Sequence, residues 1–247
     1  MSYFLTTNKV KLFYEYSPQK NKLVLVFVHG LAGQSSYWKS YWNYFKCNYG
    51  LLRFDLRGHG KSETAESYQV EDFSQDLKQL IETLKINEYY LITFSLGSLT
   101  AADFVERYEP KIKGIVMVSP LAGYDDFKTS FLLKVKLTGL FPKAGFKFLN
   151  QKKLYLGSTV LKTYLQSLSK TDSRAIFKIL KGLKNYGWIK RVKCRNLIFT
   201  ADNDQIIKNH IKDVYSNIIK LKGDHLAIFN QQKRIIKEME KFFEKAR

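Results

Sequence analysis

The sequence is poor in the features that mark extracellular and membrane proteins. It has two cysteines, Cys47 and Cys194, which lie in unrelated segments without metal-type spacing and are expected to be reduced thiols. Its longest uninterrupted apolar run, Leu23–Val28, is far shorter than the roughly 20 residues that a membrane-spanning helix needs. The N-terminal residues lack the charged start, apolar stretch and cleavage site of a signal peptide. Together these absences predict a cytoplasmic protein.

Acidic residues are also scarce, with 22 aspartates and glutamates against 41 lysines and arginines, for a formal net charge of +19. Such an excess raises the question of a nucleic-acid or anionic-membrane partner. The basic residues are scattered, however, and form no zinc-finger, RNP or basic-arm pattern. We therefore expect no nucleic-acid partner. Two interpretations of the charge stay open. Either the basic residues only form a solvated surface, or the basic residues of the helical cap (residues 121–187) make a weak contact with an anionic membrane.

The sequence does contain material for a large core, because 45% of its 247 residues are hydrophobic and 15% are aromatic. That composition excludes low-complexity disorder and collagen-like repeats. The length suits one α/β domain with an insertion better than it suits one small domain or two full ones.

Strand-like and helix-like segments alternate through the first 120 residues. A hairpin is expected around Asn8 and Lys9, and the continuously apolar Leu23–Val28 has the pattern of a parallel strand covered on both faces. The other expected strands are Leu51–Phe54, Tyr89–Phe94 and Ile112–Val118, and the expected helices are Ser36–Lys46, Glu71–Lys85 and Leu96–Tyr108. This βαβ alternation predicts a mostly parallel sheet with right-handed crossovers.

The pattern changes after residue 120. Residues 121–187 contain no long β-branched run, carry 13 lysines and arginines against three aspartates, and are expected to form short helices. Strand and helix signals resume with Asn196–Thr200, a segment around Val214–Leu221 and a final helix near Leu226–Lys245. We therefore divide the chain into a core, residues 1–120 and 188–247, and a helical cap, residues 121–187, inserted after the sixth strand.

The first chemical signal is the segment TFSLGS at residues 93–98, where an expected strand runs into Ser95 and a helix starts directly after it. That is the context of a nucleophile elbow, in which a sharp turn exposes a serine hydroxyl above the sheet. Small residues are needed two positions either side, because strand and helix nearly touch there. Gly97 meets this requirement, whereas Thr93 replaces the usual glycine. The alternative is a serine that only caps the helix.

A second signal, HGLAG at residues 29–33, directly follows the most apolar strand. A glycine-containing loop leaves backbone N–H groups free to point at a developing oxyanion, and the N–H groups of Leu31 and Leu96 could form such a pair. The alternative is an ordinary turn between strand and helix. His29 is expected to brace this loop rather than to transfer protons.

The late part of the chain supplies a candidate base and a candidate acid. A serine hydroxyl is a poor nucleophile at neutral pH and needs a histidine that is held by a carboxylate. His225 follows an expected strand in GDHLA, and Asp204 follows another in TADNDQII. The chain order Ser95, Asp204, His225 is that of the nucleophile-elbow fold. The acids weighed against Asp204 are Asp202 and, with weaker placement, Asp55 and Asp125.

The other histidines fit the role of base less well. His59, in RGHG after a strand, is expected to fix its own loop. His210, inside an expected helix, is expected to be an exposed or packed residue. Only His225 combines a loop after a strand with the right chain order.

Taken together, these segments resemble the α/β-hydrolase fold superfamily over nearly the full length of the chain. The motifs that carry the resemblance are HGLAGQSSYW (29–38), DLRGHGKS (55–62), YQVEDFSQDL (68–77), TFSLGS (93–98), TADNDQII (200–207) and GDHLAIF (223–229). The resemblance implies an eight-stranded, mostly parallel sheet with helices on both faces and a helical cap. It also implies Ser95 as nucleophile, Asp204 as acid, His225 as base, and the backbone N–H groups of Leu31 and Leu96 as the oxyanion hole.

Within that superfamily the chain looks most similar to small capped esterases, enol-lactonases and carbon–carbon bond hydrolases. A serine at position 95 argues against the dehalogenase and epoxide-hydrolase branches, because their nucleophile is an aspartate. Two residues depart from the pattern, each in place of a glycine: Thr93 in the elbow and Ala201 before the acid. Thr93 bears on the geometry of the elbow because threonine is larger than glycine. Ala201 has little effect because alanine is nearly as small as glycine.

The expected function is hydrolysis of carboxylic esters with small or medium acyl chains, through an acyl-enzyme on Ser95. The alternatives are a carbon–carbon bond hydrolase, lactonase, thioesterase or lysophospholipase with the same triad, or a ligand-binding protein of this fold with little turnover. No cofactor or metal is expected, because the sequence has no HExxH, paired-cysteine or P-loop motif. Phe127 and Trp188 are candidates for binding substrate or for packing the cap on the core. The sequence sets no oligomeric state.

Overall fold

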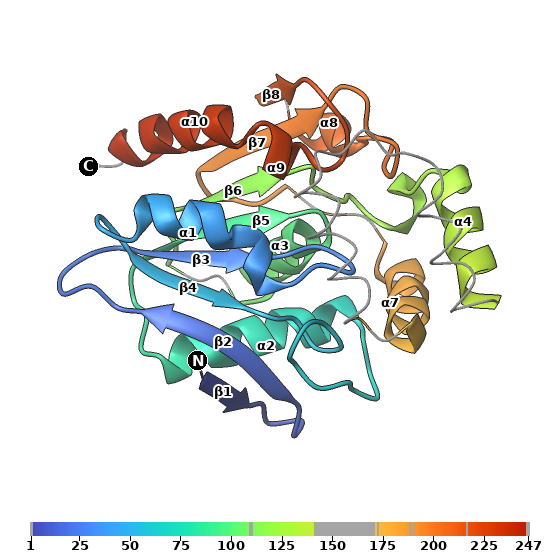
Figure 1. The fold of residues 1–247 in the computed structure, drawn as a ribbon, viewed down its shortest axis with the longest axis horizontal. Helices are drawn as coiled ribbons and strands as arrows, with labels where there is room; N and C mark the ends of the chain where they lie inside the picture. Colours follow the sequence, from blue (N-terminus) through green and yellow to red (C-terminus); the bar gives the residue numbers. More distant parts are fainter. Residues whose placement is uncertain are drawn as a thin grey trace.

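The computed structural model describes residues 2–108, 111–140, 171, 173–187, 189, 191–215 and 217–245. Its centre is one eight-stranded sheet in the order β1-β2-β4-β3-β5-β6-β7-β8 (Figure 1). The strands are β1 (Ser2–Leu5), β2 (Lys11–Ser17), β3 (Val24–Val28), β4 (Gly50–Phe54), β5 (Tyr89–Phe94), β6 (Gly114–Val118), β7 (Asn196–Ala201) and β8 (Ile218–Leu221). β2 runs antiparallel to both of its neighbours and all other neighbouring pairs are parallel, which confirms the expected mostly parallel sheet.

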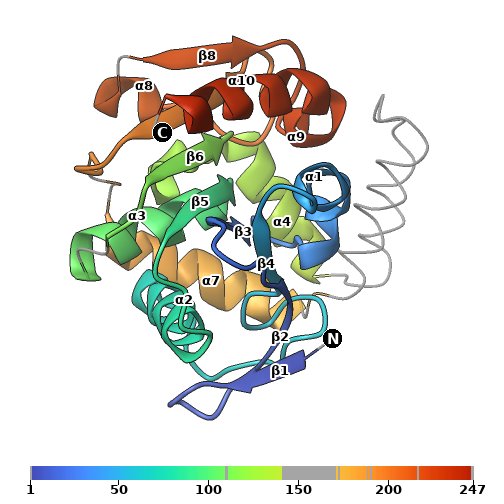
Figure 2. The same cartoon turned by 90° about the vertical axis from the view of Figure 1, so that its left-hand side faces the viewer.

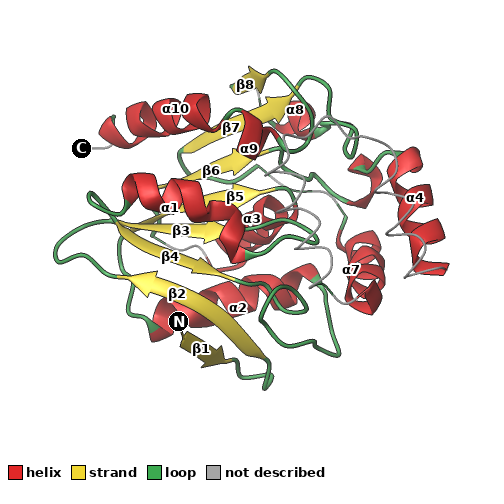
Figure 3. Ribbon diagram, viewed as in Figure 1, coloured by secondary structure: helices red, strands yellow, loops and turns green. Residues whose placement is uncertain are grey.

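Helices connect the strands and lie outside the sheet, as Figure 3 shows in red. They are the short 3-10 helices η1 (Ser35–Trp38) and η2 (Tyr124–Asp126), together with α1 (Lys39–Phe45), α2 (Val70–Thr83), α3 (Leu96–Tyr108), α4 (Thr129–Leu140), α7 (Ser173–Tyr186), α8 (Ile211–Val214), α9 (Ala227–Asn230) and α10 (Gln232–Glu244). None of these described helices is long and apolar enough to cross a bilayer.

The structure corrects two of the expected elements near the C-terminus. The expected final helix is interrupted at Gln231, whose backbone (φ −112°, ψ 20°) lies outside the helical region, so α9 and α10 are separate helices. Just before the break, Phe229 packs edge-on against Tyr37, with 4.9 Å between ring centroids. The segment expected as a strand from Val214 begins instead with the end of α8, and β8 starts at Ile218.

The continuous apolar character of β3 follows from its burial on both faces. Successive side chains of a strand point to opposite faces, so Val24, Val26 and Val28 contribute to one apolar cluster. Leu25 and Phe27 contribute to the other. The first cluster includes residues of α2, α3 and α7, and the second includes residues of α1 and α10. The sheet is therefore a middle layer with helices on both sides, as the end-on view shows (Figure 2).

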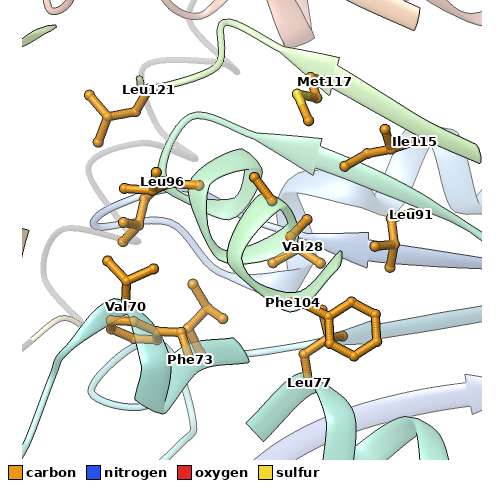
Figure 4. Packing of buried hydrophobic residues seen from close by; sticks show 14 of the residues in the cluster. Val28, Val70, Phe73, Leu77, Leu91, Leu96, Phe104, Ile115, Met117 and Leu121 are labelled. Carbon is orange, nitrogen blue, oxygen red and sulfur yellow. The ribbon is translucent and has the colours of Figure 1, made fainter. Parts of the chain in front are cut away.

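Figure 4 shows how α2 and α3 close the first of these faces. Phe73 and Leu77 of α2 and Phe104 of α3 are each at most 2% exposed and share a cluster with Leu91 of β5. Such large side chains each contribute about 2–3 kcal/mol through removal from water. This packing fixes the start of α3, and with it Ser95, relative to the sheet.

The strand order places a candidate site at one point of the sheet's edge. From β3 the chain moves outward to β4 and then returns to β5 on the other side of β3. The segments that leave the carboxyl ends of β3 and β5 therefore diverge, and ligands of open α/β sheets bind at such a switch point. The segments in question are the HGLAG loop after β3 and the turn at Ser95 after β5.

The described parts of the expected cap lie beyond the same edge of the sheet, where Figure 1 shows α4 and α7 at the right. The chain enters and leaves this region at neighbouring points of the core, because the N–H of Ile189, just after the expected cap, donates to the carbonyl oxygen of Ala122 near its start. The middle of the region, residues 141–170, lies outside the described residues. The boundaries 121 and 187 therefore stay a prediction.

Candidate active site

Ser95 occupies the turn between β5 and α3 and has an unusual backbone conformation. Its φ is +51°, in the left-handed region that non-glycine residues rarely adopt. Its neighbours explain why the chain is held there. A Cβ atom on Gly97 would lie 2.5 Å from the carbonyl oxygen of Val28, and one on Gly30 would lie 2.9 Å from the Cβ of Ser95. The turn and the HGLAG loop are thus in direct backbone contact, which requires glycine at both positions.

Thr93, which departs from the elbow pattern, is accommodated by hydrogen bonds. Its side chain is fully buried, and its hydroxyl lies 2.8 Å from the Ser98 hydroxyl. The same Thr93 hydroxyl donates to the carbonyl oxygen of Val116 on β6, at 3.0 Å. The larger residue therefore ties β5, β6 and the first turn of α3 together, and the elbow keeps its turn without the usual glycine.

The structure brings Ser95, His225 and Asp204 into one hydrogen-bonded chain. His225 Nε2 lies 3.0 Å from Ser95 Oγ, and His225 Nδ1 lies 2.7 Å from Asp204 Oδ2. Because a carboxylate only accepts hydrogen bonds, Nδ1 carries the proton and Nε2 is left to accept from the serine hydroxyl. The Phe94 ring packs against the imidazole with 5.1 Å between centroids and helps to fix its orientation.

Asp204 is held in its charged form. Burial acts to raise its pKa, whereas the adjacent His225 acts to lower it, by charge and by hydrogen bond. The N–H groups of Ile206 and Ile207 also donate to Asp204 Oδ1, at 2.8 and 2.9 Å. The net result is a pKa below the usual value for an aspartate. A carboxylate that is charged and has both oxygens occupied can orient the imidazole and stabilise its protonated form.

The peptide group between Gly30 and Leu31 is clamped beside Ser95. The Gly30 carbonyl oxygen is 2.8 Å from His29 Nδ1 and accepts the Gly33 N–H at 3.0 Å. In a trans peptide the N–H points opposite to the C=O, so the Leu31 N–H points away from this clamp. The Leu96 N–H stands at the free N-terminal end of α3. Within the described part of the chain, neither N–H donates a hydrogen bond, so both are available to a developing oxyanion.

His29 braces this loop and His59 fixes its own loop, as the sequence predicts. His29 Nε2 accepts the Leu56 N–H at 3.0 Å, which leaves Nδ1 as the donor to Gly30. His59 lies edge-on to it, with 5.2 Å between ring centroids, and its Nδ1 is 2.9 Å from the Arg57 carbonyl oxygen. Both rings are completely buried, and burial lowers the pKa of His29 to about 4 and that of His59 to about 3. Both are therefore neutral near pH 7.

The three other carboxylates that compete with Asp204 have other places in the structure. Asp202 accepts the Gly223 N–H and so holds the loop that carries His225. Asp55 accepts the N–H groups of Ser35 and Lys61, in the loops that follow β3 and β4. Asp125 is exposed.

His210 lies one residue before α8, not inside a helix as the sequence predicted, and is half-buried. Its Nδ1 is 3.5 Å from Oδ1 of Asp126, which lies in η2 near the start of the expected cap. It takes no part in the Ser95 chain of hydrogen bonds.

The two candidate substrate-binding residues differ in what can be said of them. Phe127 is buried, stacks on Phe131 with 5.3 Å between centroids and forms an isolated β-bridge with Ile207. These contacts are packing contacts at the start of the cap, so its role in substrate binding stays a prediction. Trp188 lies outside the described residues.

Sequence reasoning missed Asp126 and Lys128, which connect the cap to the segment that carries Asp204. Asp126 is fully buried and accepts the N–H groups of Ala122 and His210. The Lys128 ammonium donates to the backbone carbonyl of Asp204. Neither residue has a local motif, because its partners lie up to 84 residues away in the chain.

No group of three or more metal-ligating side chains occurs among the residues that the structure describes. Ser95 lies beside a histidine that can accept its proton and that a carboxylate holds, and the N–H groups of Leu31 and Leu96 remain the candidates for the oxyanion hole. That combination suits attack of a serine on a carbonyl carbon.

Comparison with known proteins gives a consistent picture. A family model described as alpha/beta hydrolase fold matches residues 24–171. A curated relative, 3-oxoadipate enol-lactonase 2 of Acinetobacter baylyi, is 31% identical over 113 residues, which cover 44% of this chain and 42% of the relative. The matched stretch spans less than half the length of this and similar curated relatives.

Two solved structures are similar over nearly the whole chain. One is a carboxylesterase structure from Nitrososphaera gargenis, with a TM-score of 0.86 and 17% identity, covering 99% of this chain and 98% of that one. The other is the enol-lactonase of Burkholderia xenovorans LB400, with a TM-score of 0.85 and 17% identity, covering 98% of this chain and 100% of that one. At this identity the two structures show the fold and leave the substrate open.

Proposed function

This chain belongs to the α/β-hydrolase fold family, and from that premise we propose that it is a serine hydrolase that cleaves carboxylic esters of small or medium acyl chains. The observation that carries the proposal is the position of His225, whose two ring nitrogens lie within hydrogen-bond distance of Ser95 and Asp204. A serine that only capped α3 would need no such partner.

The proposed reaction has two halves that use the same groups. In the first, Ser95 Oγ bonds to the ester carbonyl carbon while its proton moves to His225 Nε2. The tetrahedral intermediate then breaks its bond to the alcohol oxygen, which takes the proton from His225 and leaves. In the second half, water bonds to the acyl carbonyl carbon and gives a proton to His225 Nε2. The bond from that carbon to Ser95 Oγ then breaks, and His225 returns the proton to Ser95 Oγ. The free carboxylic acid and the original serine are the products.

Two further features lower the barrier. The charged Asp204 stabilises the imidazolium that forms in each half-reaction, and it holds the tautomer with the proton on Nδ1. The N–H groups of Leu31 and Leu96 are proposed to donate to the oxyanion of the tetrahedral intermediate. Loss of one such donor costs about 3–4 kcal/mol in the transition state, so clamping the Gly30–Leu31 peptide matters for rate.

A second candidate is a lactonase, which opens an internal ester by the same steps. The similarity to two enol-lactonases favours it over a thioesterase, a lysophospholipase or a carbon–carbon bond hydrolase. A panel of p-nitrophenyl esters, an enol-lactone, a thioester and a monoacylglycerol separates these substrate classes by kcat/KM. Hydrolysis of the lactone at a rate well above that of the open esters would assign the chain to the lactonase class.

The direct test of the proposal is substitution of Ser95 by alanine, assayed with p-nitrophenyl acetate and butyrate. We expect kcat to fall by roughly 10⁶-fold, as when a serine hydrolase loses its nucleophile. Ser119→Ala is the matched control, because Ser119 is also a buried serine and directly follows the neighbouring strand β6. Unchanged turnover in Ser95→Ala, or an equal loss in Ser119→Ala, would remove the proposal.

A further inference from the structure

The basic charge of this protein is distributed unequally between its helices. α7 contains Arg174, Lys178, Lys181 and Lys184 and no acidic residue. α10 is of similar length and also rich in lysine, but it interleaves three glutamates, and Lys241 pairs with Glu238 at 2.8 Å. A general bias toward lysine in the sequence would affect both helices equally. The charge of α7 is therefore a property of that helix.

The outward residues of α7 form one continuous stripe. Arg174, Phe177, Lys178, Lys181 and Lys184 are all exposed, at the three- and four-residue spacing that lines one side of a helix. Phe177 lies in the middle of this stripe with 40% of its surface exposed. We call these five residues the α7 stripe.

The opposite side of α7 fixes the direction in which the stripe faces. Ala175, Ile179 and Leu183 are each at most 1% exposed and belong to the core cluster that includes α2 and α3. A Cβ atom on Gly182 would lie 2.6 Å from the carbonyl oxygen of Tyr68, so the helix backbone rests directly on the core at this point. The helix cannot rotate to bury the α7 stripe without losing these contacts.

Two of the lysines also contact aromatic rings. Lys178 Nζ lies 5.9 Å from the centre of the Tyr68 ring, and Lys184 Nζ lies 5.0 Å from that of Tyr124. Such contacts are favourable only for the cationic form and hold the side chain in place. Two of the four cations around the exposed Phe177 ring are thus held in place by contacts within the protein.

We propose that the α7 stripe docks this protein onto an anionic lipid surface. A basic face attracts acidic headgroups, and an exposed aromatic residue among the cations can enter the boundary between headgroups and acyl chains. Single-stranded nucleic acid would match the charge and could stack one base on Phe177, but a single exposed ring on α7 does not provide the series of aromatic platforms on which successive bases stack, so nucleic acid is kept as an outcome of the test. α7 lies beyond the carboxyl ends of the parallel strands (Figure 1), and Ser95 directly follows the carboxyl end of one of them, β5. Docking therefore turns this end of the sheet toward the bilayer.

The test is co-sedimentation of the full chain with vesicles of phosphatidylcholine alone and of phosphatidylcholine mixed with phosphatidylglycerol. We expect binding that increases with the share of phosphatidylglycerol and is lost at high salt. In the variant R174Q/K181Q/K184Q each lost charge should weaken binding roughly fivefold, for a combined loss on the order of 100-fold. Phe177→Ser should also weaken binding, while leaving its dependence on salt unchanged.

The matched control is K233Q/R234Q/K237Q, which removes the same charge from exposed positions of α10. It should bind like the unmodified protein, and thermal melting of both triple variants shows that each is folded. The proposal is overturned by equal losses in the two triple variants, by binding that ignores phosphatidylglycerol, or by a folded α7 variant that binds normally. Binding of single-stranded RNA through the α7 stripe without vesicle binding would overturn it too. Because no turnover is measured, the result does not depend on the proposed esterase activity.

Discussion

At the scale of single residues, the proposed chemistry depends on which nitrogen of His225 carries the proton. Asp204 accepts from Nδ1, and this leaves Nε2 free to take the proton of Ser95. An asparagine at position 204 can donate from its amide as well as accept. It therefore allows the opposite tautomer, with the proton on Nε2, which cannot act as a base toward the serine.

This reasoning gives the first prediction, for Asp204→Asn. The variant should fold, because its side-chain oxygen can still accept the N–H groups of Ile206 and Ile207. Its kcat for ester hydrolysis should fall by roughly 10⁴-fold through the wrong tautomer. Asp202→Asn serves as the control, since Asp202 accepts the Gly223 N–H and does not contact the imidazole of His225. A smaller loss in Asp204→Asn than in Asp202→Asn would contradict the assignment of the acid.

The second prediction concerns the buried His29 and His59. Their folded pKa values, about 4 and about 3, lie below the usual histidine value of 6.5. Between about pH 4 and about pH 6.5, these two histidines bind protons in the unfolded chain but not in the folded chain. The free energy of unfolding should therefore fall as pH falls below about 6.5, by about 1.4 kcal/mol per pH unit for each histidine. Stability from this source is fully present above pH 6.5.

Urea unfolding of the unmodified protein and of His59→Gln checks this effect over the range from about pH 6 to about pH 5. The variant keeps one of the two buried imidazoles, so its slope of unfolding free energy against pH should be shallower by about 1.4 kcal/mol per pH unit. Carboxylates titrate equally in both proteins and cancel in the comparison. Parallel slopes would show that His59 is already protonated in the folded state.

At the scale of elements, the site is built where the backbones of β3, β5 and α3 nearly touch. Gly30 and Gly97 permit the approach, and Thr93 secures it through Ser98 and the Val116 carbonyl. The family pattern at position 93 calls for a small residue. In this chain a buried threonine fills the same place because β6 offers an acceptor for its hydroxyl.

The third prediction follows from the two hydrogen bonds of the Thr93 hydroxyl, to Ser98 and to the Val116 carbonyl. Thr93→Val keeps the shape of the side chain but leaves the Ser98 hydroxyl without its buried partner, so the free energy of unfolding should fall by about 1–3 kcal/mol. Thr93→Ser retains the hydroxyl and should lose less. Equilibrium unfolding in urea measures both. A valine variant as stable as the original protein would show that the Thr93 hydroxyl does not hold the elbow together.

Elements with a strong local pattern could be predicted from the sequence, and those that depend on distant partners could not. β5 and α3 have the expected boundaries, because an apolar run and a helical stripe meet at Ser95. The break between α9 and α10 has no glycine or proline to mark it. Asp126 accepts the N–H groups of Ala122 and of His210, and His210 lies too far along the chain for a local pattern to indicate the contact. For the proposed site, the order of residues along the chain indicated Ser95, Asp204 and His225. The contacts that hold these residues could be identified only from the folded structure.

At the scale of the whole molecule, a net charge of +19 is spread over a single folded chain. Like charges at this density repel one another more strongly in the compact state than in the expanded unfolded chain. Some charges are neutralised locally in buried pairs, such as Arg57 on the loop after β4 with Asp76 on α2, at 2.7 Å. Since basic residues outnumber acidic ones by almost two to one, at least 19 of them must remain without an acidic partner of their own.

The fourth prediction is that salt stabilises this protein. Raising NaCl to about 0.1 M shortens the screening length to about 10 Å and weakens the repulsion between surface charges. The midpoint of unfolding in urea, which is uncharged, should therefore increase from low salt to this concentration. The increase should be smaller in R174Q/K181Q/K184Q, which carries three fewer positive charges on α7. A midpoint that falls with salt would show that attractive ion pairs outweigh the repulsion.

The relay from Asp204 through His225 to Ser95 is tested most directly by the site of covalent labelling. A fluorophosphonate probe reacts with a serine that is activated as a nucleophile, and mass spectrometry of the digested protein identifies the residue that carries the adduct. We expect one adduct on Ser95, formed much more slowly in His225→Ala and not at all in Ser95→Ala. An adduct on another serine, or ester hydrolysis that continues in a protein whose Ser95 stays unlabelled, would contradict the proposed relay.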